Sequence, residues 1–373
     1  MDADIILVIV VVTALAFDFT NGFHDTANAV ATSISTRAMS PKAAVGMAAA
    51  LNFVGAFISL EVAATVAKGI VEAEAVTTTI VFAGLIGAIA WNLATWYFGL
   101  PSSSSHALIG GVAGAAFVAA GPDAVLGDGL LHKVIIPALV APIIAFFAAA
   151  MAILIAYRIV GRVQPGPVNR WFRDGQIITG AMFSLAHGTN DAQKTMGIIT
   201  LALIASGHLS GAGGDFEVPL WVIVSSASAI ALGTYSGGWR IIRTMGSRII
   251  KMDPAQGFSA QGAGAAVVLA ASHLGYPLST THVISGSVMG AGAARRLSAV
   301  RWGVAGNMAV AWVLTLPAAA TIGALAYGIS SIFGDGALGP IIVSLCVIGL
   351  IAATLGRRLA RGPAITAPAP QST

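Results

Sequence analysis

Charged residues are scarce in this sequence. Its 373 residues include 19 Lys and Arg and 15 Asp and Glu, so charged residues make up 9% of the chain, against roughly 25% in soluble domains. Hydrophobic residues make up 57%, and a soluble fold of this size could not cover its surface with so few charges. The 44 glycines fit closely packed helices in lipid, where glycine is unusually frequent. The composition therefore predicts a polytopic membrane protein.

Cysteine and excess charge are also nearly absent. The single Cys346 excludes a disulfide framework and a thiolate metal site. The formal net charge of +4 is small enough to arise from basic loops on one side of a membrane, so we expect no nucleic-acid partner. Asp2 and Asp4 stand where a cleaved signal peptide would carry basic residues, which argues against such a peptide.

Apolar segments recur along the chain, and most reach the roughly 17–25 residues needed to cross a bilayer. They lie at about 5–36, 43–67, 78–98, 101–120, 134–160, 176–206, 219–237, 258–275, 277–293, 302–327 and 338–356. The positive-inside rule places the basic connections between them in the cytoplasm. The segments 78–120 and 258–293 then each return to the side from which they came, as a helical hairpin. Seven crossings remain, which predicts a multi-pass protein of the cell (inner or plasma) membrane with its N-terminus outside and its C-terminus in the cytoplasm.

Two pairs of motifs indicate an internal repeat. Asn21–Asn28 aligns with His187–Lys194 at an offset of 166, and Pro101–His106 aligns with Pro277–His282 at an offset of 176. An odd number of crossings separates the copies, so they face opposite ways, as in transporters that work by alternating access. We predict an all-α fold of about 11 helical segments, an inverted-topology repeat with two helical hairpins and interrupted helices. Its predicted parts are a first repeat at 1–160, a cytoplasmic linker at 161–175, a second repeat at 176–330, a final transmembrane helix at 331–360 and a disordered tail at 361–373.

Acidic side chains lie inside two of the predicted spans. Asp25 shares one helical face with His24 and Asn28, and Asp191 shares the matching face with Lys194. An ionised carboxylate at this depth costs at least about 2.5–3.5 kcal/mol by insertion scales. Such groups persist mostly where they bind ions, relay protons or line a wet cavity. The alternative for Asp191 is a structural ion pair with Lys194.

Glycines stand beside both acidic motifs. Gly22 and Gly188 predict either local unwinding of the helix or the close approach of another backbone. Unwinding would expose carbonyl oxygens that could coordinate a cation beside Asp25 and Asp191.

A hydroxyl-rich tip follows a proline in each predicted hairpin. Proline favours the first helical position, and Ser or Thr can satisfy the free amides there. Each tip should therefore open a half-helix whose N-terminal amides form an anion site, and the two ends should meet near the middle of the membrane. The hydroxyls can donate to a tetrahedral oxyanion, or they can bond to their own helix instead. His106 and His282 follow the tips as candidate proton carriers or anion contacts, since histidine changes charge near neutral pH.

At these residues the sequence resembles the PiT-type inorganic phosphate transporters, and most of all their bacterial low-affinity Pit branch. The resemblance rests on four separated segments, Asn21–Thr32, Gly99–His106, His187–Lys194 and Pro277–His282. It implies a homodimer of inverted-repeat protomers in the lipid bilayer, with phosphate held between the hairpins and the two acidic segments. We assign phosphate binding to Ser103, Ser104, Ser105, Ser279, Thr280, Thr281, Asn28 and Asn190. We assign coupling to the ion or proton to Asp25, Asp191, His24, His106, His282 and Lys194.

Two departures from the family pattern bear on the coupling ion. Sodium-coupled relatives typically carry Asn-Asp-X-Ala-Asn in both acidic motifs, whereas this chain has His24 in the first copy and Gln193 and Lys194 in the second. The fixed charge of Lys194 should disfavour a cation there. The pattern is similar to that of proton-coupled bacterial members, in which phosphate can travel as a neutral complex with a divalent metal. We expect no cofactor and no metal site made by the protein alone.

The sequence therefore predicts a secondary active transporter that imports inorganic phosphate by proton symport with alternating access. Sodium coupling, or sulfate as the substrate, are the alternatives within transport. An enzyme is not expected, because no GxSxG-type motif marks one nucleophile among the duplicated hydroxyls.

Overall fold

The computed structural model describes residues 2–72, 75–209, 217–334 and 336–360. Across these residues the chain is helical, and the only strand-like pairing is an isolated antiparallel bridge between Val71 and Val125. The predicted all-α fold is confirmed. The predicted tail at 361–373 lies outside the described residues.

The first half of the chain contains a long helix, a broken helix, a hairpin and a second long helix. These are α1 (Asp2–Ser35), the pair α2 (Pro41–Gly55) and α3 (Glu61–Lys68), the pair α4 (Thr78–Phe98) and α5 (Ser104–Ala120), and α7 (Ile136–Val160). Three short elements join α5 to α7, namely η2 (Pro122–Ala124), α6 (Gly127–Gly129) and η3 (Leu130–Ile135).

The second half repeats this order. It consists of α8 (Pro165–Ala205), the broken run of α9 (Leu220–Ser236), α10 (Trp239–Arg243) and η4 (Thr244–Arg248), the hairpin of α11 (Pro254–His273) and α12 (Thr280–Ala293), the short η5 (Leu297–Ala299), and α13 (Trp302–Ser331). The helix α14 (Leu338–Ala360) follows. Even the interior prolines correspond, since Pro142 lies inside α7 and Pro317 inside α13.

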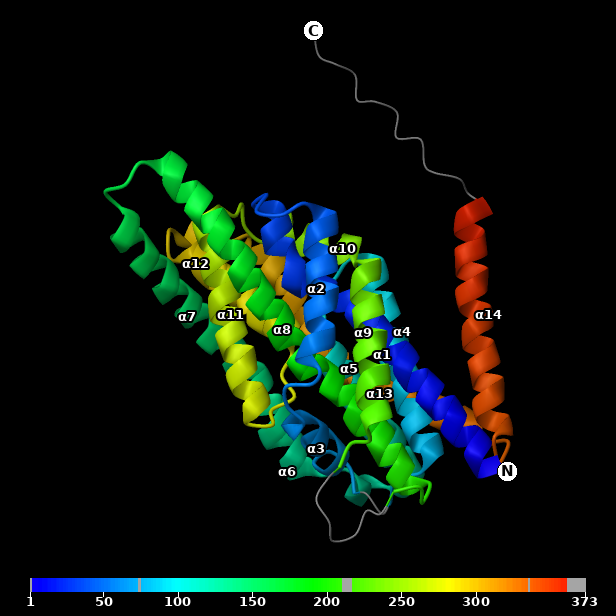
Figure 1. Cartoon of the computed structure of the whole chain (residues 1–373). Helices are drawn as coiled ribbons and strands as arrows, with labels where there is room; N and C mark the ends of the chain where they lie inside the picture. Colours follow the sequence, from blue (N-terminus) through cyan, green and yellow to red (C-terminus); the bar gives the residue numbers. More distant parts are fainter. Residues whose placement is uncertain (1, 73–74, 210–216, 335, 361–373) are drawn as a thin grey trace.

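The connections predicted to be cytoplasmic lie at one end of the bundle. Figure 1 shows the α1–α2 turn, the α7–α8 turn and α10 together at this end, which we call the basic end, and α3 and α6 at the opposite end. The start of α1 and the end of α14 also lie at opposite ends, as an odd number of crossings requires. The side of the membrane that each end faces stays a prediction.

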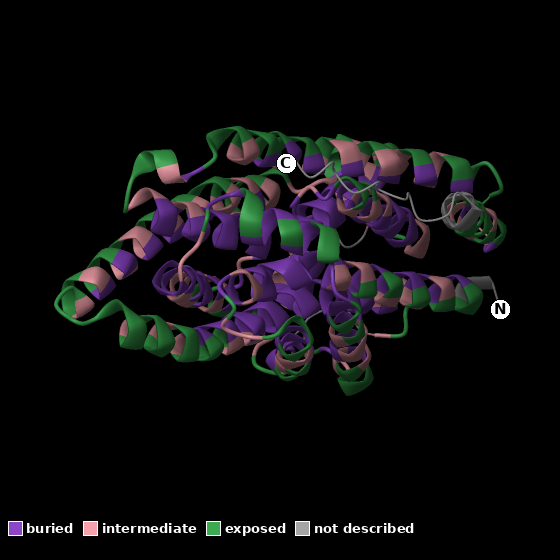
Figure 2. Cartoon of the chain, turned by 90° about the horizontal axis from the view of Figure 1, so that it is seen from above, coloured by how far each residue is buried: buried purple, intermediate pink, exposed green. Residues whose placement is uncertain are grey.

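Four described helical runs are long and apolar enough to cross a membrane by length and composition: Asp4–Ser35, Thr78–Phe98, Gly127–Val160 and Trp302–Ser331. The bent pair Leu220–Ser236 and Trp239–Arg248, with an angle of 58°, would make a fifth. Seen from above, buried residues fill the centre of the bundle and exposed ones its rim (Figure 2). The exposed side chains of α7, such as Leu139, Ile143 and Phe147, are apolar and suit contact with lipid. The count of seven crossings stays a prediction.

Local sequence signals set the ends of the hairpin helices. Asp253 and Gln256 form a capping box at the start of α11, with Pro254 in the first turn. Gly99 and Gly275, with φ of 66° and 71°, follow the ends of α4 and α11. This left-handed conformation suits glycine, so both hairpins turn back at comparable points.

Glycines let the two halves interlock. A Cβ at Gly22 of α1 would lie 2.2 Å from a backbone oxygen of α9, and one at Gly233 of α9 would lie 2.1 Å from a backbone oxygen of α1. Gly188 of α8 and Gly55 of α2 form the equivalent contact, with distances of 2.2 and 2.3 Å. Each long helix thus packs on the broken helix of the other half, at a separation that only glycine permits.

Each hairpin also packs on the opposite half of the chain through glycines. A Cβ at Gly110 or Gly114 of α5 would lie 2.6 or 2.2 Å from a backbone oxygen of α13. A Cβ at Gly286 or Gly290 of α12 would lie 2.3 or 2.0 Å from one of α7. The second helix of each hairpin therefore packs on the long helix of the opposite half.

The structure decides between the two alternatives for the glycines, describes the predicted linker and corrects the expected position of the prolines. The helices α1 and α8 continue through Gly22 and Gly188, so these glycines serve close approach and not unwinding, and the interruptions lie at 56–60 and 237–238. The segment predicted as a linker, 161–175, is helical from Pro165 onward. Pro101 and Pro277 precede the capping residues and do not occupy the first helical position.

We predict that Gly290→Ala destabilises the protein. The added methyl group would overlap the backbone of α7, and overpacking of this kind typically costs about 1–3 kcal/mol. The control is Gly306→Ala in α13, where a Cβ meets nothing within 4 Å. Thermal unfolding of the detergent-purified variants measures the effect, and equal transition temperatures for both would contradict the predicted packing.

Candidate functional site

The two hydroxyl-rich tips meet in the middle of the bundle. Ser105 Oγ at the start of α5 donates to the carbonyl oxygen of Leu278 over 3.1 Å. The ring centroids of His106 and His282 lie 4.9 Å apart. All four residues are buried. The N-termini of α5 and α12 therefore come together from opposite hairpins, as the sequence predicts.

The tip hydroxyls divide into capping groups and free groups. Ser103 accepts from the backbone amide of His106 over 3.1 Å, and Ser279 accepts from that of His282 over 3.3 Å. These two serines are therefore N-caps. Ser104 Oγ is buried and has no hydrogen-bond partner among the described residues, so it remains free to donate to a ligand.

The tip of the second hairpin lies on both acidic motifs. Thr280 Oγ1 donates to Asp191 Oδ2 over 3.2 Å, and Thr281 Oγ1 donates to Asp25 Oδ1 over 3.4 Å. Asn28 Nδ2 donates to the two hydroxyls over 3.3 and 2.9 Å respectively. Residues from α1, α8 and α12 thus form one hydrogen-bonded cluster.

Lys194 joins this cluster to the first hairpin. Its ammonium donates to Asp191 Oδ1 over 2.5 Å and to the carbonyl oxygen of Leu278 over 2.8 Å, and it also donates to Ser105 Oγ. The ion pair considered as an alternative for Asp191 is present. Since the same ammonium reaches both tips, the pair belongs to the site as well as to the fold.

The first carboxylate faces a histidine. His24 Nδ1 lies 2.6 Å from Asp25 Oδ1, and His24 Nε2 lies 3.1 Å from Thr95 Oγ1 of α4. The Thr95 hydroxyl donates to the carbonyl oxygen of Trp91, so its oxygen accepts from Nε2–H. A contact of 2.6 Å between His24 Nδ1 and Asp25 Oδ1 is a hydrogen bond and needs a proton between the two atoms, so this pair can hold a proton in addition to the one on Nε2.

The second carboxylate also has a histidine beside it, although His187 Nε2 makes no hydrogen bond among the described residues. His187 Nε2 lies 3.0 Å from Asp191 Oδ2, and His187 Nδ1 lies 3.1 Å from Asn52 Oδ1 of α2. The Asn52 amide nitrogen donates to Thr234 Oγ1 over 2.7 Å, so the Asn52 oxygen accepts from Nδ1–H. Each buried Asp thus faces a His nitrogen that can take up a proton.

The charges of the site do not balance. Among the groups that contact the tips, Asp25 and Asp191 contribute −2 and Lys194 contributes +1, which leaves −1 when both histidines are neutral. An ionised Asp18 would make this charge more negative. The side chains of Asp25, Asp191 and Lys194 are buried, where charge is costly. The binding of an anion at such a site is favoured when protons or cations bind with it.

The other assigned residues lie at the edges of the cluster. His282 stacks on Trp312 with ring centroids 4.1 Å apart, and in the described part of the chain neither His282 nor His106 contacts a carboxylate. The Asn190 amide donates to Ser272 Oγ over 2.8 Å and to the carbonyl oxygen of Tyr276 over 3.2 Å. Asn190 therefore holds the turn between α11 and α12.

Four residues of the site were not assigned from the sequence. His187 and Asp18 share helical faces with the acidic motifs, and this spacing could have identified them as site residues. Asn52 and Thr95 stand alone in apolar segments. Asp18 is fully buried, and neither of its carboxyl oxygens has a hydrogen-bond partner among the described residues. Ligand atoms of Asp25, His187 and Asp191 all lie within 4.8 Å of one another, which could suit a cation.

Comparison with known proteins agrees with this chemistry. The model of the phosphate transporter family matches residues 21–166 and 161–323. A "Probable low-affinity inorganic phosphate transporter" of Mycobacterium bovis is 52% identical over 358 residues, covering 96% of this chain and 85% of the relative. Proteins with the same name from Rhizobium meliloti and Bacillus subtilis are 50% and 48% identical, covering 88% and 87% of this chain and 98% and 96% of theirs.

A solved structure shares the fold. It is titled "The sodium-dependent phosphate transporter" and superposes with a TM-score of 0.77 at 27% identity. The similarity covers 88% of this chain and 99% of that chain. The interlocked hairpins and long helices thus belong to an architecture already seen in transport.

We predict that Asp191 and Lys194 are strongly coupled in stability. Lys194→Gln leaves the Asp191 carboxylate buried without its ammonium, and removal of one partner of a buried pair costs about 3–5 kcal/mol. The double variant Asp191→Asn/Lys194→Gln should be more stable than the sum of the single effects, by about 0.5–3 kcal/mol. Thermal unfolding in detergent measures this coupling. Additive effects of the two substitutions would show that the two side chains do not stabilise each other.

Proposed function

Because the chain belongs to the phosphate transporter family, we propose that it imports inorganic phosphate by proton symport with alternating access. The observation that carries the coupling is the pair of His–Asp contacts, His24 with Asp25 and His187 with Asp191. The relatives are named as transporters, which agrees with a protein that moves phosphate without changing it.

Hydroxyls and one ammonium provide the contacts for phosphate. Ser104 has a free hydroxyl, and Ser105, Thr280 and Thr281 carry hydroxyls that can reorient from their present partners toward an anion. The Lys194 ammonium lies among them. The N-terminal amides of α5 and α12 add favourable dipoles. This donor set matches a tetrahedral oxyanion.

Protons would supply the positive charge that phosphate needs. A proton on His24 or His187 turns a lone pair that faces a carboxylate into a charged donor to it. This change neutralises the net charge of −1, so that an anion can bind without adding to an existing negative charge. Asp18 is a third group that can take up a proton, since its carboxyl is buried without a partner among the described residues. Phosphate and protons thus favour each other's binding.

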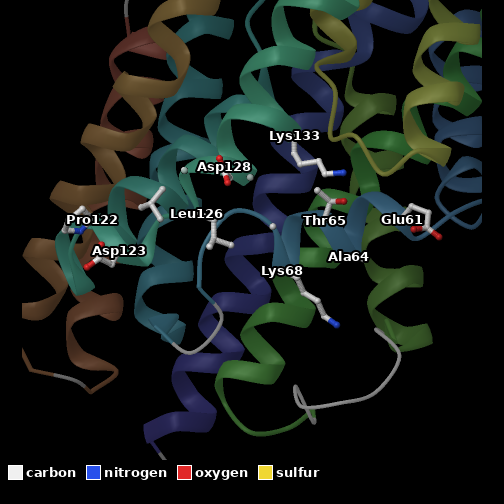
Figure 3. Close-up of a pocket in the computed structure, with 13 residues that line it drawn as sticks. Glu61, Ala64, Thr65, Lys68, Pro122, Asp123, Leu126, Asp128 and Lys133 are labelled. Carbon is white, nitrogen blue, oxygen red and sulfur yellow. The ribbon is translucent and has the colours of Figure 1, made fainter.

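The turn of each hairpin contacts a short helical element at its own end of the protein, through a hydrogen bond for the first hairpin and through close packing for the second. We call these two contacts the clamps. At the basic end, Thr244 Oγ1 donates to the carbonyl oxygen of Gly99 over 2.9 Å. At the opposite end, a Cβ at Gly275 would lie 3.1 Å from Thr65 Oγ1 of α3. There α3 and residues 122–133 line a cavity of about 740 Å³, with Lys68 and Lys133 among the side chains drawn in Figure 3. Release of one clamp at a time would open the site to one side only.

Sodium coupling is the second candidate. The solved structure with the similar fold is titled as sodium-dependent, and Asp25, His187 and Asp191 place ligand atoms within 4.8 Å. Against sodium, a histidine nitrogen and the Lys194 ammonium already lie on these carboxylates. The same three ligands would also suit a divalent metal that enters with phosphate as part of the substrate.

The test is uptake of radiolabelled phosphate into proteoliposomes that contain the protein. We expect accumulation when only a proton gradient is imposed, and no stimulation by a sodium gradient. Unlabelled arsenate should compete and sulfate should not. Uptake with and without magnesium tests the metal-phosphate form. Uptake driven only by sodium would overturn proton coupling and leave phosphate transport in place.

Histidine variants extend the same experiment. His24→Gln and His187→Gln should each lower proton-driven uptake at least about tenfold, the loss expected for a charge-assisted contact, while exchange of internal for external phosphate persists. The control is His273→Gln, because His273 is exposed and contacts only its own helix. Unchanged proton-driven uptake in both site variants would exclude the His–Asp pairs as proton carriers.

A further inference from the structure

A second pocket with anion chemistry lies at the basic end. It has a volume of about 440 Å³ and lies between the turn after α4 and the run of α10 and η4. Arg240, Arg243 and Arg248 line it together with the aromatic residues Tyr97 and Trp239. The central site contains none of these residues, so this is a separate pocket.

The guanidinium groups of this pocket are not neutralised. No Asp or Glu of the described chain forms an ion pair with Arg240, Arg243 or Arg248, and no acidic residue lines the pocket. By contrast, Arg295 at the same end pairs with Asp253. Three uncompensated arginines around one hollow attract an anion with several oxygens, since each guanidinium can donate two parallel hydrogen bonds.

One of the three arginines is held in place. Arg240 donates to the carbonyl oxygen of Tyr97, and its guanidinium lies 5.3 Å from the ring centroid of Trp96 and 5.2 Å from that of Tyr97. Arg243 and Arg248 are exposed and have no side-chain hydrogen bond among the described residues. They are therefore available for a ligand.

The surroundings point to a ligand near the membrane surface. Tyr97 and Trp239 are 48% and 50% exposed, and exposed aromatic residues beside arginines are typical of the headgroup region of a bilayer. Phosphoryl groups occur there in anionic lipids, and inorganic phosphate released from the central site would pass the same end. Both ligands present the same anion to the arginines.

We propose that this pocket binds a phosphoryl group, either on an anionic lipid headgroup or as free inorganic phosphate. The ligand acts on the hairpin, because Thr244 and Arg240 hold the carbonyl oxygens of Gly99 and Tyr97, two to four residues before Pro101. An occupied pocket reinforces this clamp. The basic end then opens less often, and the rate of transport falls without a change in the central site.

The experiment measures binding to the full chain purified in detergent. One arm titrates a short-chain phosphatidylglycerol, with short-chain phosphatidylcholine as the uncharged control. The other arm counts bound radiolabelled phosphate by equilibrium dialysis. Both arms compare the wild type with Arg243→Gln/Arg248→Gln. The matched control is Arg158→Gln/Arg162→Gln, which removes the same charge from exposed positions at the same end, outside the pocket.

The lipid form of the proposal predicts that phosphatidylglycerol binds the wild type and the control, and binds the Arg243/Arg248 variant at least about tenfold more weakly. The free-phosphate form predicts two bound phosphates in the wild type and one in that variant. Equal binding of both probes to all three proteins would overturn the proposal. Neither binding measurement requires transport, so a failure of the proposed symport would not affect them. Arg243 and Arg248 are exposed, so their replacement should leave the fold intact.

Discussion

The ammonium of Lys194 is the contact on which the arrangement of the site depends. It holds Asp191 on its own helix, the carbonyl oxygen of Leu278 in one hairpin and the hydroxyl of Ser105 in the other. Three segments that are far apart in the sequence therefore share one buried cation. Because an unpaired charge at this depth is costly, the Lys194–Asp191 pair stabilises the arrangement in which the two tips contact each other. A ligand that enters must replace some of these contacts with its own.

The same charge constraint is the physical basis of the proposed coupling. The site carries two carboxylates and one ammonium, so an anion alone would add negative charge to a site that is already negative. The histidines beside Asp25 and Asp191 resolve this conflict, since each has one nitrogen engaged by another helix and the other facing a carboxylate. In the proposed symport, proton uptake at these nitrogens would compensate the charge of the anion.

The sequence predicted the parts that follow from repeated local patterns. Duplicated Pro, Ser and His marked both tips, and Gly110 and Gly286 pack in equivalent places. The sequence could not decide whether the helix unwinds at Gly22 or another helix packs closely against it, because the lack of a side chain at glycine permits both. Thr95 and Asn52 were out of reach for another reason. Their roles depend on which helix packs beside them, and that helix belongs to the other half of the chain or to a distant part of the same half.

The packing between the two halves has a mechanical consequence. The second helix of each hairpin packs on the long helix of the other half. The turn of each hairpin contacts a short helical element of that other half, η4 for the first hairpin and α3 for the second. Neither half can therefore move as an independent body. The two clamps differ in charge, with arginines at α10 and both Glu61 and Lys68 at α3. If the proposed arginine pocket binds anions, the two ends would respond differently to them, although the inverted repeat builds both ends from similar elements.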